Sequence, residues 1–302
     1  MVNKLGLGKV NTPTAFTVPS VVNTLLCRDL ALDLAAAPRI MGIVNTTPDS
    51  FHADSRQPTL DAALAHARRL IAEGADLLDI GGQSTRPGYV EVDRPTEIAR
   101  TAPVLRALAA EFPALPLSID TYHPEVAAAA LAAGAHILND IHGLQGPGGP
   151  ALARLAAESG AALVLMHHDV ALREAAPDAD PLPPVLAFLR RSIDLALAAG
   201  VPADRIVIDP GIGFGKTQPQ NVALLARIHE LNTLGLPVLL GVSRKSVFGH
   251  LLPELATPAD RLEATLAVTA LATRAGVRLH RVHDVAACRR AARIAAALQT
   301  SG

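Results

Sequence analysis

The sequence has few aromatic residues and no long apolar run. Phe, Tyr and Trp make up 3% of its 302 residues, and Trp is absent. Because half of the residues are hydrophobic, Ala and Leu must fill the core, which predicts a helix-rich protein. No apolar stretch reaches the roughly 18 residues that a membrane span needs, and the polar residues 1–11 do not resemble a signal peptide. We expect a cytoplasmic protein without a membrane partner.

The sequence also lacks a charge excess and a cysteine motif. Lys and Arg number 27 against 28 Asp and Glu, giving a net charge of −1. No overall field attracts nucleic acid or an anionic membrane, so we expect no nucleic-acid partner. Cys27 and Cys288 are far apart and outside any Cys-x-x-Cys pattern. We expect both to be reduced packing residues of a cytosolic protein.

Short apolar runs alternate with helical patterns along most of the chain. The predicted strands are 39–44, 75–80, 116–120, 136–139, 162–166, 205–209, 237–241 and 278–282. The predicted helices are 59–73, 96–111, 124–133, 150–159, 184–199, 221–234, 259–275 and 284–298. Eight strand–helix pairs predict an α/β protein with a (β/α)8 TIM barrel rather than a doubly wound sheet. We expect one barrel domain over residues 39–302 and an N-terminal extension over residues 1–38. Segments 14–22 and 25–34 of this extension are predicted to pair as a hairpin over the barrel's amino-terminal mouth.

Most predicted strands end in a polar side chain. These side chains are Asn45, Asp79, Asp120, Asn139, Asp140, His167, Asp209, Lys245, Arg281 and His283. The carboxyl ends of barrel strands meet at one rim, where the active sites of such enzymes lie. Three loops also belong to this rim, 45–58, 81–94 and 243–258. The first two are long and rich in Thr, Ser, Asp, Gly and Pro, and we expect them to close over a substrate.

Two strand ends indicate an anion site. Arg281 and His283 are two residues apart, so both face the same side of an extended strand. Asp284 follows as a candidate N-cap of the last helix. An anion site, or a surface Arg beside a satisfied His, fits this pattern equally well. Lys245 follows Gly241 at the end of the seventh strand, where it can supply a positive charge at the rim. The alternative interpretation is that Lys245 is a solvated residue in a turn.

The segment 209–217 (DPGIGFGKT) is glycine-rich but is not a nucleotide-binding loop. A Walker A motif requires glycine at the position of Pro210, and the Gly-x-Gly-x-x-Gly spacing is absent. We expect these glycines to let the backbone wrap a flat ligand on which Phe214 stacks. Asp120 and Asn139 suit a heterocycle with amino and carbonyl edges. The run 167–169 (HHD) is a poor chelator because neighbouring strand residues face opposite sides.

The motifs together resemble the dihydropteroate synthase family. The matching segments are 40–51 (IMGIVNTTPDSF), 79–88 (DIGGQSTRPG), 117–121 (LSIDT), 137–140 (ILND), 165–167 (LMH), 209–216 (DPGIGFGK), 241–246 (GVSRKS) and 281–285 (RVHDV). They occur in order, one at each strand end. The resemblance implies condensation of 4-aminobenzoate with a dihydropterin bearing a hydroxymethyl diphosphate, with release of diphosphate. It also implies a homodimer built through helices away from the rim.

The resemblance assigns roles to individual residues. Lys245, Asp120, Asp209 and Arg86 are the expected catalytic residues. Asp120, Asn139, Asp209 and Lys245 are expected to bind the pterin, with Met166 and Phe214 packing near its ring. Phe51, Arg86, Pro87, Lys245 and Ser246 are expected to frame the aminobenzoate. Arg281, His283, Thr85, Arg86 and Asn45 are expected at the diphosphate, and Asn45 is the expected ligand of a Mg²⁺ cofactor.

The sequence departs from the family pattern in its first loop. Segment 52–56 (HADSR) replaces the usual Ser-Asp-Gly-Gly, and Gln83 stands where Glu is common. A non-catalytic pterin-binding paralogue therefore remains an alternative. A pterin-dependent methyltransferase domain is a weaker one, because it needs neither the segment 243–245 (SRK) nor the Arg281 and His283 pair.

Overall fold

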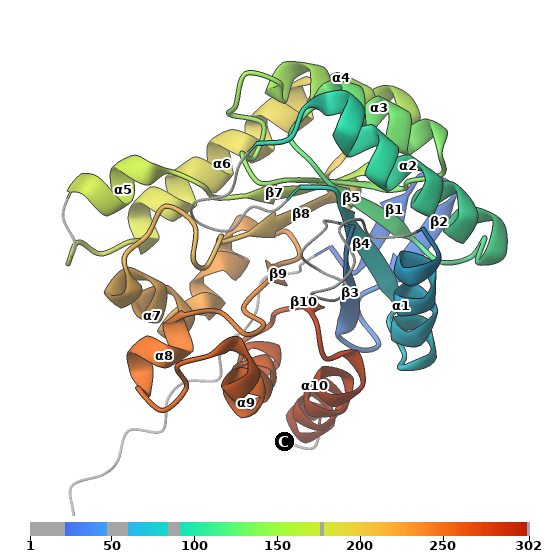
Figure 1. Cartoon of the computed structure of the whole chain (residues 1–302). Coiled ribbons are helices and arrows are strands. Elements are labelled where there is room, and N and C mark those ends of the chain that lie inside the picture. The colour runs from blue at the N-terminus through green and yellow to red at the C-terminus, as the bar shows by residue number, and fades with distance from the viewer. Residues whose placement is uncertain (1–21, 47–59, 84–90, 176–177, 301–302) are drawn as a thin grey trace, which may run out of the picture.

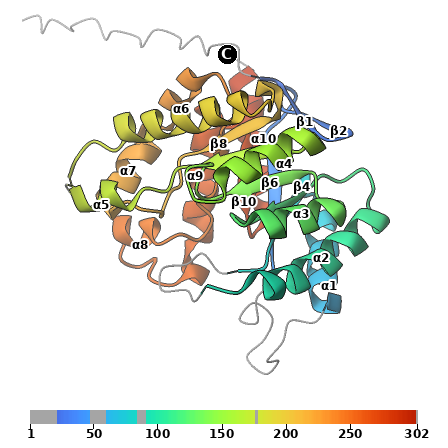
Figure 2. The same cartoon turned by 90° about the horizontal axis from the view of Figure 1, so that it is seen from above.

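Eight parallel strands form the centre of the molecule. The computed structural model describes residues 22–46, 60–83, 91–175 and 178–300. The strands lie in the order β8-β7-β6-β5-β4-β3-β10-β9, and a parallel bridge between Ile208 and Val238 joins the two ends of the sheet. The predicted TIM barrel is therefore confirmed, and the helices surround the strands in both views (Figures 1 and 2).

Each predicted strand is present, with ends that shift by up to two residues. The observed strands are β3 Arg39–Asn45, β4 Leu77–Gly81, β5 Leu117–Asp120, β6 Ile137–Asp140, β7 Ala162–Met166, β8 Ile206–Asp209, β9 Leu239–Leu240 and β10 Leu279–Val282. The polar residues that close the predicted strands thus lie at the carboxyl-terminal end of the barrel.

The helices follow the predicted order, but two predicted helices differ in form, and two short helices at 170–175 and 247–251 were not predicted. They are α1 Leu60–Ala72, α2 Arg94–Glu111, α3 Pro124–Ala132, α4 Gly149–Ser159, α5 Val170–Ala175, α6 Leu182–Ala198, α7 Gln218–Ala226, α8 Val247–Leu251, α9 Leu262–Arg274 and α10 Val285–Thr300. The predicted helix 221–234 is split, because Arg227 leaves the helical conformation and the 3-10 helix η3 Ile228–Leu234 follows. The predicted helix 259–275 begins as the 3-10 helix η4 Pro258–Arg261. None of the helices in the described ranges is both long and apolar enough to cross a bilayer.

The barrel interior changes from apolar to polar along the strands. Its apolar part consists of Met41, Leu77, Ile137, Ala162, Val164, Val207, Leu239 and Leu279, which form one buried cluster. Because strand side chains alternate between the two faces, the residue two positions further on also faces inward. Those next inward positions include Asp79, Asn139, Asp209, Gly241 and Arg281. The intervening residues, such as Leu78, Leu138 and Ile208, pack outward in a separate cluster with the helices.

A β-hairpin fills the amino-terminal mouth of the barrel. Strands β1 Thr24–Cys27 and β2 Leu30–Asp33 pair antiparallel. Leu25, Cys27, Leu32 and Leu34 belong to the same buried cluster as the apolar barrel interior. The prediction of a hairpin at this mouth is right, but the predicted pairing of 14–22 with 25–34 is wrong. The chain reverses at a two-residue turn in which Arg28 takes a φ of 58°, so both strands fit within residues 24–33. Residues 14–21 lie outside the described part, and the domain boundary at residue 38 stays a prediction.

Replacing Leu25 with Ala tests whether the hairpin and barrel share one core. Leu25 is fully buried, so we expect Leu25→Ala to lower the free energy of unfolding by about 2–5 kcal/mol, measured by urea denaturation. Thr24→Ala, at the exposed neighbouring position, is the control and should change little. Equal small effects from both variants would contradict a shared core.

Candidate active site

An arginine and two aspartates form the centre of the candidate site. Arg281 on β10 donates through Nε to Asp79 Oδ2 at 2.6 Å and through Nη2 to Asp120 Oδ2 at 2.8 Å. Asp79 on β4 is fully buried and Asp120 on β5 nearly so. Asn139 on β6 also donates to Asp79 Oδ2, at 3.1 Å. Four strands therefore bring their inward polar side chains into one bonded cluster.

Burial raises the pKa of Asp120. Loss of water raises it from 3.8 to about 7, because an ionised carboxyl is poorly solvated inside the barrel. Arg281 opposes this shift, and the charge of Asp79 adds to it. Asp120 is thus poised to exist in both protonation states near neutral pH. A carboxyl of this kind can donate or accept a hydrogen bond, which suits recognition of a heterocyclic edge.

Asp209 ends β8, beside Gly241, which follows β9. Its Oδ1 accepts the N–H of Gly211 at 2.7 Å. A Cβ atom on Gly241 would lie 3.8 Å from Asp209 Oδ2 and 3.9 Å from Arg281 Cβ. The glycine therefore leaves open space between the Asp209 carboxylate and Arg281. Burial raises the pKa of Asp209, and Lys245 opposes the shift.

Lys245 and Phe214 form the next part of this wall. The Lys245 ammonium lies 4.5 Å from the centre of the Phe214 ring, a cation–π geometry, and donates to the carbonyl of Ile212. Burial lowers the pKa of Lys245 to about 8, although the charge of Asp209 raises it. Lys245 is therefore not a solvated turn residue.

The remaining described candidates occupy the same rim. Met166 ends β7 and is buried. Ser246 is exposed, and its Oγ accepts from Gln218 Nε2 at 3.0 Å. His283 lies 3.0 Å from Ser243 Oγ through its Nδ1. Phe51, Thr85, Arg86 and Pro87, together with most of both predicted closing loops, lie outside the described residues, so their roles stay predictions.

The predicted anion site differs in its details. Arg281 is occupied by two carboxylates rather than left open to solvent, and Asp284 binds Arg244 through both oxygens, at 2.6 and 2.8 Å. The other two parts of the predicted anion site, His283 and the start of α10, lie beside the Arg244–Asp284 pair. An incoming anion would therefore meet Arg281 from the side that Asp79 and Asp120 leave uncovered.

Two buried polar residues at this end of the barrel were not among the predicted site residues. Asp79 is the hub of the cluster, and its position at a strand end is the only sequence signal that marks it. Lys216, in the glycine-rich loop after β8, is 6% exposed and donates to His167 Nδ1 at 2.7 Å. The sequence shows no partner for a buried lysine there.

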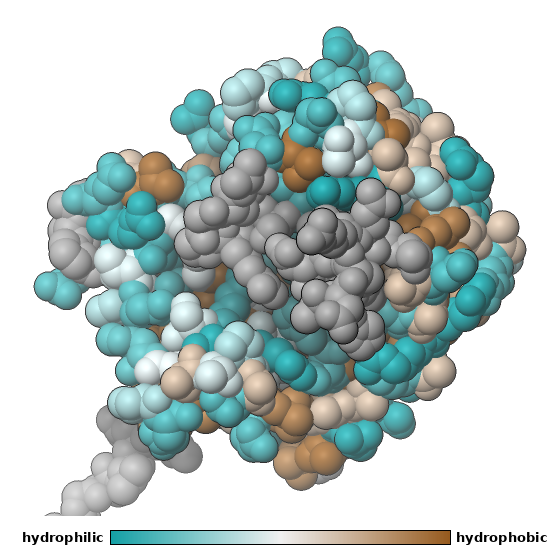
Figure 3. All heavy atoms as spheres, in the orientation of Figure 1, coloured by the Kyte–Doolittle hydropathy of each residue, from teal (hydrophilic) through white to brown (hydrophobic). Residues whose placement is uncertain are grey.

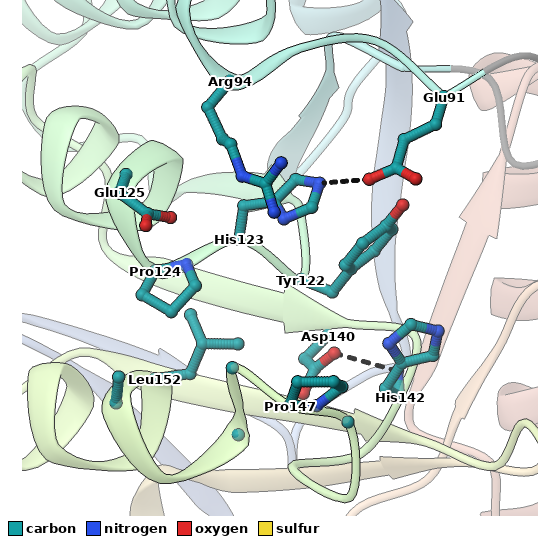
Figure 4. A pocket seen from close by; sticks show the side chains of 14 residues that line it. Glu91, Arg94, Tyr122, His123, Pro124, Glu125, Asp140, His142, Pro147 and Leu152 are labelled. Carbon is teal, nitrogen blue, oxygen red and sulfur yellow. Dashed lines mark hydrogen bonds and ion pairs between the residues drawn. The ribbon is translucent and has the colours of Figure 1, made fainter.

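A separate cavity of about 420 Å³ lies outside the cluster that Arg281 forms with Asp79, Asp120 and Asn139. Tyr122, His123, His142, Arg94 and Glu91 are among its lining residues, and the starts of α3 and α4 border it (Figure 4). Its lining does not contain the substrate-binding residues predicted from the sequence. Two of its acidic side chains already have partners, because Glu91 contacts His123 Nε2 at 3.4 Å and Asp140 accepts two backbone N–H groups.

Asn45, the predicted Mg²⁺ ligand, lies near Asp120 at this end of the barrel. A Cβ atom on Gly81 would lie 3.8 Å from both Asn45 Oδ1 and Asp120 Oδ2. Oxygen donors of this kind suit a hard cation such as Mg²⁺, and the role of Asn45 stays a prediction. Within the described ranges, no three His, Cys, Asp or Glu side chains gather into a metal cage. A cation there would therefore take further oxygens from a ligand or water.

Among the residues drawn in colour in Figure 3, hydrophilic ones predominate on the face shown.

Comparison with known proteins identifies the family. Residues 41–283 match the family model described as pterin binding enzyme. The chain is 40% identical to a dihydropteroate synthase of Bacillus subtilis over 90% of this chain and 92% of that one. It is 39% identical to the Escherichia coli dihydropteroate synthase, over 86% and 91%.

The chain belongs to the dihydropteroate synthase family of pterin-binding enzymes.

Solved structures of this family share the fold. A Xanthomonas albilineans dihydropteroate synthase with 4-aminobenzoic acid superposes with a TM-score of 0.84, at 44% identity, over 92% of this chain and 98% of that one. The same species' enzyme with 7,8-dihydropteroate gives 0.78 at 42% identity, over 92% and 98%. The expectation of a dihydropteroate synthase, a transferase of folate biosynthesis, is confirmed.

Asp120 should make stability depend on pH. The folded state holds the Asp120 proton up to about pH 7, whereas its ordinary pKa is 3.8. The stability that the folded state gains by holding this proton is fully present below about pH 4 and is lost as pH rises through 7. Asn cannot titrate, so we expect Asp120→Asn to remove this loss. Between pH 4 and 7 the free energy of unfolding should therefore fall more steeply in the wild type than in Asp120→Asn.

Urea denaturation at several pH values measures this difference. Asp194→Asn, at an exposed position on α6, is the control and should leave the pH profile unchanged. Parallel profiles for the wild type and Asp120→Asn would show that Asp120 is ionised throughout this range.

Proposed function

We propose that this chain joins 4-aminobenzoate to (7,8-dihydropterin-6-yl)methyl diphosphate, giving 7,8-dihydropteroate and diphosphate. The observation that carries the proposal is the meeting of Asp120, Asn139, Asp209, Lys245 and Arg281 at one barrel end. Membership of the dihydropteroate synthase family supports the same reaction.

The pterin edge needs both donors and acceptors, and this end of the barrel supplies them. Carboxyl oxygens of Asp120 and Asp209 would accept from the pterin's amino and ring N–H groups. The Asn139 amide and Lys245 ammonium would donate to its carbonyl and unprotonated ring nitrogen. Met166 and Phe214 would pack against the flat ring. Asp79 would not need to touch the substrate, since it fixes Arg281 and Asn139.

We propose a dissociative substitution at the methylene carbon. The C–O bond to diphosphate breaks with its electrons leaving on the diphosphate, and the pterin delocalises the resulting positive charge. The aromatic amine then attacks this carbon, forming the C–N bond and losing a proton. Catalysis comes from orientation, exclusion of water and charge stabilisation, with Lys245, Asp120, Asp209 and Arg86 in the catalytic roles and no protein nucleophile.

Binding of the leaving group is assigned to cationic and polar residues of the rim. Arg281 and His283 would contact the diphosphate, together with Thr85 and Arg86 of the second loop. Asn45 would hold Mg²⁺, which when bound supplies charge neutralisation for the diphosphate oxygens. Ser246, Phe51, Pro87 and Arg86 would frame the aminobenzoate beside Lys245.

Diphosphate release in the presence of both substrates tests the proposal. The wild type should release diphosphate only when both are present with Mg²⁺. Lys245→Met should lower kcat/KM about 100-fold or more, because the buried ammonium is lost from the substrate site, while thermal unfolding stays close to that of the wild type. Arg290→Met, at an exposed position on α10, is the control.

The outcomes separate the rival functions. Pterin binding without any turnover would favour a non-catalytic paralogue. Near-normal turnover of Lys245→Met would remove Lys245 from the mechanism. Methyl transfer from a methylated folate, with no diphosphate chemistry, would favour a methyltransferase domain.

We further propose a homodimer that packs through α9 and α10. Leu271 on α9 is 67% exposed, and Ile294 and Leu298 on α10 are 63% and 62% exposed. Ile294 and Leu298 are one turn apart, so they share a face. Gln299 donates to the Arg274 carbonyl at 3.2 Å, which keeps these ends of the two helices together. Exposed apolar side chains gathered in this way are typical of a protein interface.

Leu271→Glu tests the dimer. A charge introduced at a face that two copies share should convert the protein to a monomer, measured by sedimentation or light scattering. Leu195→Glu, at an exposed leucine of α6, is the control and should keep the dimer. A wild type that is monomeric at micromolar concentration would rule the proposal out.

We also propose that the protein works in the cytoplasm. Cys27 and Cys288 are free thiols and both are buried. Burial raises the pKa of Cys27 to about 12 and that of Cys288 to about 11. Thiols of this kind stay protonated and unreactive, as expected of packing residues in a reducing compartment.

A further inference from the structure

The loop that joins β8 to α7 has an unusual backbone. Gly211, Gly213 and Gly215 have φ angles of 64°, 84° and 57°, a region that residues with a Cβ rarely adopt. A Cβ on Gly211 would clash with the carbonyl of His167, and one on Gly215 would lie 2.5 Å from the carbonyl of Asp169. The loop is therefore pressed against the chain that follows β7.

Lys216 ties this loop together from the inside. Its Nζ donates to the carbonyls of Gly211 and Phe214, both at 3.0 Å, and to His167 Nδ1 at 2.7 Å. These three close acceptors match the three donors of an ammonium group, and a fourth, the His167 carbonyl, lies further away at 3.5 Å. The acceptor role of Nδ1 requires a neutral His167 ring with its proton on Nε2. Burial and the nearby Lys216 charge lower the pKa of His167, which keeps the ring neutral.

A second lysine binds the same loop from the substrate side. Lys245 donates to the carbonyl of Ile212, which lies between the two carbonyl groups held by Lys216, and its ammonium rests over the Phe214 ring. The backbone carbonyls of one short segment are thus divided between two ammonium groups. Gly213 N–H adds a bond to Asn221 Oδ1 at 2.7 Å, which fixes the loop to α7.

We propose that Lys216 and His167 are a positioning pair for the substrate site. They set the plane of the Phe214 ring and the direction of the Ile212 carbonyl, and through these the position of the Lys245 ammonium. Neither side chain contacts a substrate. The proposal rests on the proposed function for its kinetic consequence, and its geometric consequence can be measured without any substrate.

The first experiment tests the geometry without substrate and uses the NMR signal of the Phe214 ring as a reporter. The chain has 6 Phe residues, so ¹³C-labelled Phe gives a small NMR spectrum in which Phe214→Leu identifies the Phe214 signal. Lys216→Met keeps an apolar chain of similar length but removes all three donors. We expect it to shift or broaden the Phe214 ring signal. His167→Phe, which removes the acceptor, should move the same signal.

The matched control is Thr217→Ala at the neighbouring residue. The Thr217 hydroxyl accepts from the N–H of Gln220 at the start of α7, so its loss weakens the helix start but leaves the carbonyls of Gly211 and Phe214 bonded to Lys216. This variant should unfold at a lower urea concentration, with an unchanged Phe214 signal. An unchanged signal in Lys216→Met would overturn the proposal, whatever the enzyme assay shows.

The kinetic arm is a double-mutant cycle. We expect Lys216→Met to lower kcat/KM about 10- to 100-fold, the effect of a small displacement of groups that contact the substrate. Combined with Phe214→Ala, the further loss should shrink to about 2-fold, because the ring that Lys216 positions is gone.

The proposal would be overturned if Lys216→Met lowered kcat/KM by the same factor with and without Phe214→Ala. It would also be overturned if Lys216→Met lowered stability without changing kcat/KM. A wild type that releases no diphosphate would instead disprove the proposed function. In that case the Phe214 signal still decides whether Lys216 positions the ring.

Discussion

The alternation of side chains along a closed set of strands governs this protein. Each strand shows every second residue to the interior, so each can place one apolar group deep in the barrel and one polar group above it. Leu77 is followed inward by Asp79, Ile137 by Asn139, and Leu279 by Arg281. A shift of one residue in any strand would turn both groups outward. The core and the polar end are therefore specified together.

The polar end is held in place by its own charges. Arg281 is shared by Asp79 and Asp120, and the same Asp79 oxygen accepts from Asn139. Partly buried ion pairs of this kind add little net stability, because desolvation offsets their attraction. Their contribution is to hold donors and acceptors in fixed directions before a ligand arrives. Such preorganisation lowers the cost of binding a polar heterocycle.

Much of this arrangement could be predicted from the sequence, and the limits have physical causes. Strand positions were predictable because apolar runs end in polar residues at a barrel rim. The hairpin pairing was wrong because strands of four residues carry little periodicity, and helices α5 and α8 are too short to show any. Asp79 was placed at the rim but its central bonding role was not predicted, and no role was predicted for Lys216, because their partners, Arg281 and His167, are distant in the sequence. Sequence spacing holds no information about which distant side chains share a buried space.

The closure of the barrel is uneven. Strand β9 has only two residues, Leu239 and Leu240, and in the described part a single bridge joins β8 to the chain just before it. This joint has the fewest paired residues of the described wall, and it lies between the strands leading to Asp209 and to Gly241. The side chains above this joint therefore depend less on strand pairing and more on their own contacts, such as the bond that Asp209 Oδ1 accepts from the Gly211 N–H.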